Sequence, residues 1–142
     1  MKSLPLMGGC QCGVVRYEVT SSPLNLFICH CRDCKKQSTS AFGISAMFIT
    51  ADVHLLGGEL KNWPRRTGSG RILNCFFCPI CGSRIWDRDP DFEDDMCIKG
   101  GSLDEPLDLS EAIHIWTSRK APGVVIPDGA RQFAEGPKHN ST

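Results

Sequence analysis

The stretch Cys29-His30-Cys31-Arg32-Asp33-Cys34 places three thiols within six residues. Residues at i and i+2 of an extended segment point to the same side, so Cys29 and Cys31 can bind one ion while His30 faces away. The turn that follows brings Cys34 round as a third ligand. Three protein ligands and one open position are typical of catalytic zinc. This stretch therefore predicts a catalytic metal centre, and the rest of the chain is expected to support it.

A second group of cysteines lies on both sides of this stretch. Cys10 and Cys12 form a Cys-x-Cys near the start, and Cys78 and Cys81 form a Cys-x-x-Cys much later in the chain. Four thiolates complete a tetrahedral shell and exclude water, so this set predicts a structural zinc that joins two distant segments. The alternative is a redox dithiol at Cys78 and Cys81, which the absence of a βαβ pattern around them disfavours.

The two remaining cysteines of the nine, Cys75 and Cys97, stand apart from these groups. They lie on alternating apolar segments and are expected to be buried thiols. Alternatively, one of them completes the middle group as a fourth ligand and makes it a second closed site. His30 is expected beside the metal or at the surface, and His114 in the core or in a pocket wall.

Three basic residues follow the middle cysteines closely: Arg32, Lys35 and Lys36. Three thiolates on Zn²⁺ leave a negative centre, which these side chains could offset while attracting an acidic substrate. The alternative is that they form a solvated basic turn.

The chain has 142 residues, zero formal net charge and 41% apolar residues. This length predicts one domain over residues 1–142, with a core at about 8–137 and an irregular C-terminal tail. The balanced charge argues against nucleic acid as a partner, and no apolar run is long enough to span a membrane. The N-terminus lacks the apolar region of a signal peptide, so we expect a cytoplasmic protein. The sequence does not determine the oligomeric state.

Short apolar segments with frequent Gly and Pro predict an all-β domain. The period-2 pattern is clearest from Val15 to Val19 and from Phe42 to Ile49. Other strands are expected at 24–28, 53–56, 60–63, 71–77, 85–86, 96–99 and 112–117.

Together these motifs resemble those of the glutathione-dependent formaldehyde-activating enzyme (GFA) family, which includes centromere protein V. The resemblance covers roughly residues 8–137 and rests on motifs in the same order. These motifs are Gly8-Gly9-Cys10-Gln11-Cys12-Gly13, Cys29 to Cys34, Phe77-Cys78-Pro79-Ile80-Cys81-Gly82-Ser83, Gly100-Gly101-Ser102-Leu103-Asp104 and His114-Ile115-Trp116.

The resemblance implies a β-tent (Mss4-like) fold, a small zinc-binding domain of antiparallel sheets. It implies one zinc on Cys10, Cys12, Cys78 and Cys81, and a catalytic zinc on Cys29, Cys31 and Cys34 that is weakly held without substrate. The implied activity is that of a carbon–sulfur lyase forming S-hydroxymethylglutathione from glutathione and formaldehyde, with a small-molecule thiol as partner. Fold and metal chemistry are expected to transfer more safely than substrate.

Two other functions are alternatives to this activity. A B-type methionine sulfoxide reductase needs a reactive cysteine in an Arg-aromatic-Cys-x-Asn context, which Met96-Cys97-Ile98 does not supply. The second alternative is not an enzyme: it is a non-catalytic zinc module that binds macromolecules. The zero net charge argues against nucleic acid as the partner of such a module.

Overall fold

Two β-sheets make up most of the structure, a computed structural model that describes residues 3–137. The smaller sheet has the order β1 (Leu6–Gly9), β2 (Arg16–Val19) and β5 (Val53–Gly57). The larger sheet has the order β10 (Ile113–Ile115), β3 (Asn25–Cys29), β4 (Gly43–Ile49), β9 (Phe92–Lys99), β8 (Arg84–Asp89), β7 (Ile72–Phe77) and β6 (Lys61–Arg66). All neighbours in it pair antiparallel except β10 and β3.

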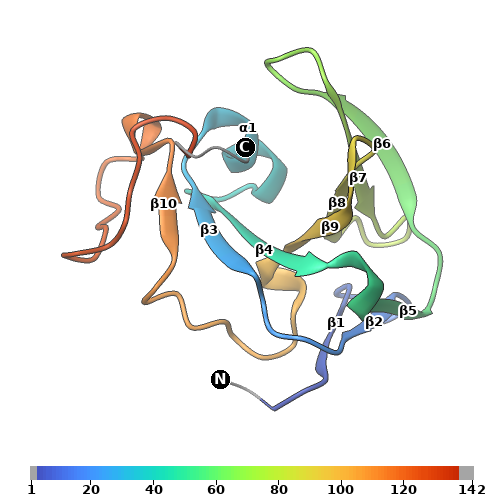
Figure 1. Ribbon diagram of the computed structural model, residues 1–142. Coiled ribbons are helices and arrows are strands. Elements are labelled where there is room, and N and C mark those ends of the chain that lie inside the picture. The colour runs from blue at the N-terminus through green and yellow to red at the C-terminus, as the bar shows by residue number, and fades with distance from the viewer. Residues whose placement is uncertain (1–2, 138–142) are drawn as a thin grey trace.

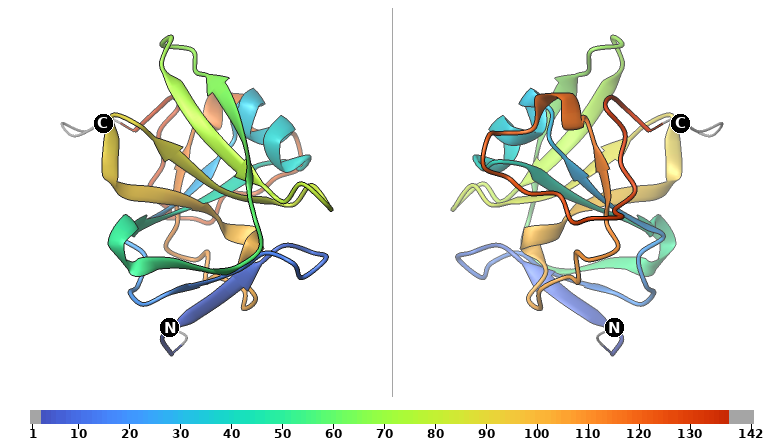
Figure 2. Two further views of the ribbon diagram at one scale, coloured as in Figure 1. Left: turned by 90° about the vertical axis from the view of Figure 1, so that its right-hand side faces the viewer. Right: turned by 90° about the vertical axis from the view of Figure 1, so that its left-hand side faces the viewer.

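One short helix, α1 (Arg32–Ser38), connects β3 to β4. Figure 1 shows α1 and the smaller sheet at opposite ends of the molecule, with the larger sheet curving between them, and Figure 2 shows the same arrangement from two sides. Three 3-10 turns complete the described elements: η1 (Thr50–Asp52), η2 (Gly100–Ser102) and η3 (Thr117–Arg119). No helix among residues 3–137 is both long and apolar enough to cross a membrane. The predicted mainly β fold is confirmed.

The core lies between the smaller sheet and one face of the larger sheet. The alternating apolar positions of β2 and β4 supply it, because alternate residues of a strand point to the same face. Tyr17 and Phe48 are fully buried, and the Tyr17 ring meets Trp86 of β8 edge to face, with centroids 5.5 Å apart. The opposite face of the larger sheet is therefore free to carry polar groups.

The strand β1 was missed from the sequence, because Gly8 and Gly9 weaken the strand pattern. Neither Gly8 nor Gly9 has a positive φ. A Cβ on Gly8 would overlap the Tyr17 ring, whose hydroxyl pairs with Ser102 Oγ at 2.6 Å. Gly8 therefore serves close packing between β1 and β2, whereas the positive φ of this loop belongs to Gly13.

Other element boundaries also differ from expectation. The strand predicted to stop before Pro64 continues to Arg66, because β6 is a sheet edge, where a proline is tolerated. The strand expected at 96–99 begins earlier, at Phe92, so the acidic run at residues 93–95 lies in β9. The predicted irregular tail has no named strand, but within its described part Gln132 forms a parallel bridge with His114. The last five residues of that tail, 138–142, lie outside the described residues.

Candidate metal centres

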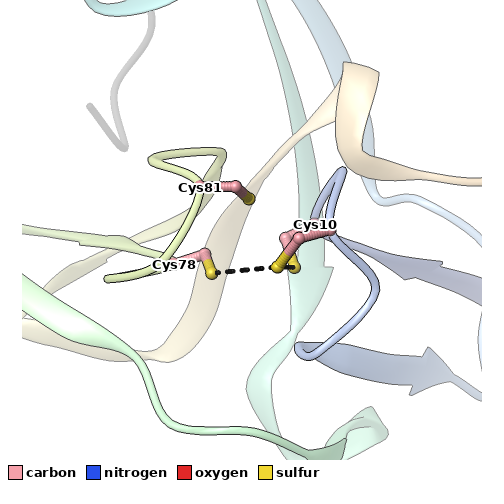
Figure 3. Close-up of side chains that lie close together, drawn as sticks. Cys10, Cys78 and Cys81 are labelled. Atoms are coloured by element: carbon pink, nitrogen blue, oxygen red, sulfur yellow. Dashed lines mark hydrogen bonds between the residues drawn. The ribbon is translucent and has the colours of Figure 1, made fainter.

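Cys10, Cys12, Cys78 and Cys81 form one group, with all four Sγ atoms within 4.8 Å of one another. The Sγ atoms of Cys10 and Cys12 are 3.5 Å apart, and those of Cys12 and Cys78 are 3.8 Å apart. A tetrahedral zinc with Zn–S bonds of about 2.3 Å needs sulfurs roughly 3.8 Å apart. Figure 3 shows Cys78 and Cys81 on one loop facing Cys10 on the other. The donor set thus fits zinc in both chemistry and spacing.

Two tight loops position these four thiols. Gly13 and Gly82 have φ values of 86° and 81°, which only glycine adopts easily, and each N–H donates to the carbonyl of the first cysteine in its loop. Backbone N–H groups also point at the sulfurs: Val15 N lies 3.2 Å from Cys10 Sγ and Ile80 N lies 3.4 Å from Cys78 Sγ. Such donors favour thiolates over thiols.

Ser83 links the two loops. Its hydroxyl accepts from the backbone N–H of Gln11 at 3.0 Å and lies 3.3 Å from Cys81 Sγ. Hydrogen bonds from the Ser83 hydroxyl and backbone lower the pKa of Cys81 to about 5. This loop therefore presents a ligand that is already ionised near neutral pH.

Cys29, Cys31 and Cys34 form the second group, again with their Sγ atoms within 4.8 Å of one another. Cys29 ends β3, Cys31 is the N-cap residue of α1, and Cys34 lies in the first turn of that helix. Among residues 3–137, no fourth histidine, cysteine, aspartate or glutamate joins these three. The alternative in which Cys75 or Cys97 completes the group is therefore wrong: both lie apart, on β7 and β9.

The start of α1 favours a thiolate at Cys31. Its Sγ accepts from Cys34 N at 3.3 Å, which is the N-cap interaction of the helix. Hydrogen bonds from the Cys29 and Cys34 thiols lower the pKa of Cys31, whereas hydrogen bonds to Cys29 and Cys31 raise the pKa of Cys34. Because metal ligands must be deprotonated, metal binding by this group would release protons.

His30 lies between two of these cysteines but its ring is directed into the interior. The ring is fully buried, and Nε2 lies 3.0 Å from Nδ1 of His114, itself buried on β10. Burial lowers the pKa of both histidines, with the neighbouring His114 adding to the effect on His30. His114 is thus a core residue, as predicted, whereas His30 is buried rather than at the surface.

A cleft of about 670 Å³ opens beside the second group. Cys34 lines it, together with the polar residues 37–40 at the end of α1, the turn η2, Gly82 and Ser83, and Arg84 at the start of β8. Cys10 of the other metal group and its neighbour Gln11 border it as well. Clefts of this volume are typical of small-molecule sites.

The basic residues of this cleft are not the ones that follow the middle cysteines in the sequence. Arg32, Lys35 and Lys36 do not line it, and Lys35 Nζ instead donates to the carbonyl of Arg119. The basic residues that do line it are Arg84 and Lys99. Sequence reasoning missed both, although a lysine at the end of the apolar segment Met96 to Lys99 was a signal that this strand end meets something polar.

Comparison with known proteins now adds to this geometry. Residues 5–119 match the sequence profile of the family described as glutathione-dependent formaldehyde-activating enzyme. The chain belongs to the GFA family. The resemblance inferred from the cysteine motifs is thereby confirmed over most of the chain.

Two relatives of this GFA-family chain extend the comparison. It is 28% identical over 128 residues to a Halomonas elongata protein named "Putative glutathione-dependent formaldehyde-activating enzyme", covering 85% of this chain and 80% of that protein. It also resembles a crystal structure of a Rhodobacter sphaeroides protein, with a TM-score of 0.57 and 23% identity over 76% of this chain and 98% of the other. The second comparison supports the fold alone.

Proposed function

We propose that this chain is a zinc-dependent carbon–sulfur lyase that acts on a thiol adduct, with S-hydroxymethylglutathione, formed from glutathione and formaldehyde, as the first candidate. The observation that carries the proposal is the second cysteine group. Its three sulfurs converge without a fourth protein ligand among residues 3–137, and Cys34 lines a substrate-sized cleft. The name of the Halomonas elongata relative agrees with this activity.

The two groups are proposed to have different roles because they differ in ligand number. Cys10, Cys12, Cys78 and Cys81 would hold a structural zinc, since four thiolates leave no place for substrate. Cys29, Cys31 and Cys34 would hold a catalytic zinc whose fourth position is available to an incoming thiol. A site with three ligands holds its ion less tightly alone, so its occupancy would rise with added thiol.

Bound zinc would supply Lewis acidity that keeps the substrate sulfur deprotonated at neutral pH. Cys29, Cys31 and Cys34 would hold that ion, with Cys31 and Cys34 positioned by the first turn of α1 and Cys29 by β3. A substrate sulfur bound there would meet an aldehyde in the cleft with much of the entropic cost of their encounter already met. In the reaction one sulfur–carbon bond forms, the carbonyl π electrons move to oxygen, and the thiol proton is in effect transferred to that oxygen.

The experiment that tests the proposal measures exchange between formaldehyde and S-hydroxymethylglutathione by NMR. The zinc-loaded protein should increase the exchange rate above the spontaneous rate, and the Cys31→Ser variant should not. Metal analysis of the same samples should give one zinc per chain that survives dialysis and a second that appears with added glutathione. If a single zinc binds under every condition, the catalytic assignment is wrong.

A further inference from the structure

Asp87 is a buried carboxylate with two cationic partners. Its side chain is 4% exposed, and its oxygens lie 2.8 Å from Lys99 Nζ and 3.3 Å from Arg84 Nη2. Two positive side chains thus share one negative side chain. Among these three side chains, one positive charge is therefore left in excess.

That excess charge lies at the cleft rather than in bulk water. Arg84 and Lys99 both line the cleft that contains Cys34, and their side chains are only 20% and 19% exposed. The Nε atom of Arg84 is buried and has no hydrogen-bond partner among residues 3–137. A partly desolvated cation attracts an anion more strongly than a solvated one, because the local dielectric constant is lower.

Among residues 3–137, the carboxylate that lines this cleft is Asp104, and it does not balance this charge. Arg16 instead holds Asp104 through two nitrogen–oxygen contacts of 3.0 and 2.5 Å. A second cleft, of about 780 Å³, has the opposite character. Asp87, Asp89, Asp91 and the acidic residues 93–95 outnumber Arg71 and Arg131 along its border, so it is less suited to an anion. The cleft beside Cys34 is therefore the one suited to an acidic ligand.

We propose that Arg84 and Lys99 bind a carboxylate of the substrate, so that the cleft selects thiols that carry an acidic group. The inference rests on the proposed function, since it places the substrate sulfur at the group that contains Cys34. An acidic thiol would then be held at two points, its sulfur at the metal and its carboxylate at the two cations. Neutral thiols would be held only by their sulfur, at the metal.

The test measures dissociation constants by isothermal titration of the zinc-loaded protein with four ligands. Glutathione carries a thiol and carboxylates, its diethyl ester keeps the thiol alone, S-methylglutathione keeps the carboxylates alone, and 2-mercaptoethanol is a small neutral thiol. Glutathione should bind at least about tenfold more tightly than its diester, because charge-assisted hydrogen bonds contribute on this scale.

Arg84→Gln is the main variant, because Asp87 keeps its closer partner Lys99. It should weaken glutathione and S-methylglutathione by about 10- to 100-fold and leave the diester and 2-mercaptoethanol within about twofold. Lys99→Gln should act similarly, and Arg84→Lys should retain much of the affinity. Lys36→Gln is the matched control, because it also removes one positive charge. Lys36 lies on the same helix as Cys34, but its side chain is exposed and does not line the cleft. Thermal melts establish that each variant is folded.

The outcomes separate this inference from the proposed function. Equal glutathione affinity in wild type, Arg84→Gln and Lys99→Gln would overturn it, as would a diester that binds as tightly as glutathione or a failure of all four ligands to bind. If S-methylglutathione binding depends on Arg84 while no hydroxymethyl adduct is ever formed, the carboxylate site stands and the lyase proposal fails. If adduct forms at an unchanged rate in both variants, the lyase proposal stands and the carboxylate site is wrong.

Discussion

His30 Nε2 and His114 Nδ1 lie 3.0 Å apart in the interior, joining the loop of the second cysteine group to β10. The parallel pairing of β10 with β3 sets this contact, since Ile115 is opposite Cys29 and His114 is opposite Ile28. His30 N also donates to Ile115 O at 3.0 Å. The loop that carries Cys29 and Cys31 is therefore anchored by a residue far along the chain.

The first prediction concerns this histidine pair. Replacing His114 with Ala should leave a buried imidazole nitrogen of His30 without its partner, at a cost of about 1–3 kcal/mol in the free energy of unfolding. The measurement is urea denaturation of the zinc-loaded protein. His54→Ala is the control, because His54 is exposed on β5 and should cost less than about 0.5 kcal/mol. Equal losses in both variants would contradict an anchoring role for His114.

A second prediction separates the two cysteine groups. Cys81→Ser should prevent stable folding, because the four-cysteine group joins the loop after β1 to the loop after β7 and its metal would contribute folding free energy. Cys31→Ser should leave the far-ultraviolet circular dichroism spectrum and most of the thermal stability intact while removing thiol-dependent metal binding. Equal losses of melting temperature would show that both groups have the same structural role.

The cysteine groups could be predicted from the sequence because their members are close in the chain. Ligands two or three residues apart lie in one loop whatever the fold, so Cys29, Cys31 and Cys34 meet without any tertiary information. Joining Cys10 and Cys12 to Cys78 and Cys81 required only that four thiolates complete a tetrahedron. The strands that bury one face, such as β2 and β4, were predicted from their period of two.

The strand β1 and the charged residues of the cleft could not be predicted, because they depend on tertiary packing that the periodicity of the sequence does not encode. Gly8 looked like a loop residue because nothing local shows that the Tyr17 ring lies against it. Arg84 and Lys99 are distant in sequence, and they meet at Asp87 only because β8 and β9 pair with Trp86 opposite Ile98. From the sequence, the basic residues adjacent to the cysteines could be only one candidate for this role, with a solvated turn as the alternative, whereas the basic residues that line the cleft come from other strands.

A third prediction follows from Gly8. Alanine at this position should force the Tyr17 ring or the backbone to move, and should lower the free energy of unfolding by about 1–3 kcal/mol, as overpacking of a dense core does. Gly68→Ala is the control, because Gly68 is exposed and a Cβ there meets nothing within 4 Å. Tyr17→Phe should cost about 0.5–1.5 kcal/mol through loss of the hydrogen bond to Ser102. If Gly8→Ala is as mild as Gly68→Ala, the close contact with Tyr17 does not constrain this position.

The fourth prediction concerns Asp87, the buried carboxylate that pairs with Arg84 and Lys99. Asp87→Ala should lower the free energy of unfolding by about 3–5 kcal/mol, because it leaves Lys99 and Arg84 partly buried without their anion. Asp94→Ala, on an exposed position of β9, should cost less than about 0.5 kcal/mol. The double variant Asp87→Ala with Lys99→Met should recover part of the loss, since it removes one of the two unpaired cations. Urea denaturation of the wild type, the single variants Asp87→Ala and Lys99→Met, and the double variant completes the cycle. Purely additive losses would mean that Asp87 and Lys99 do not interact in solution.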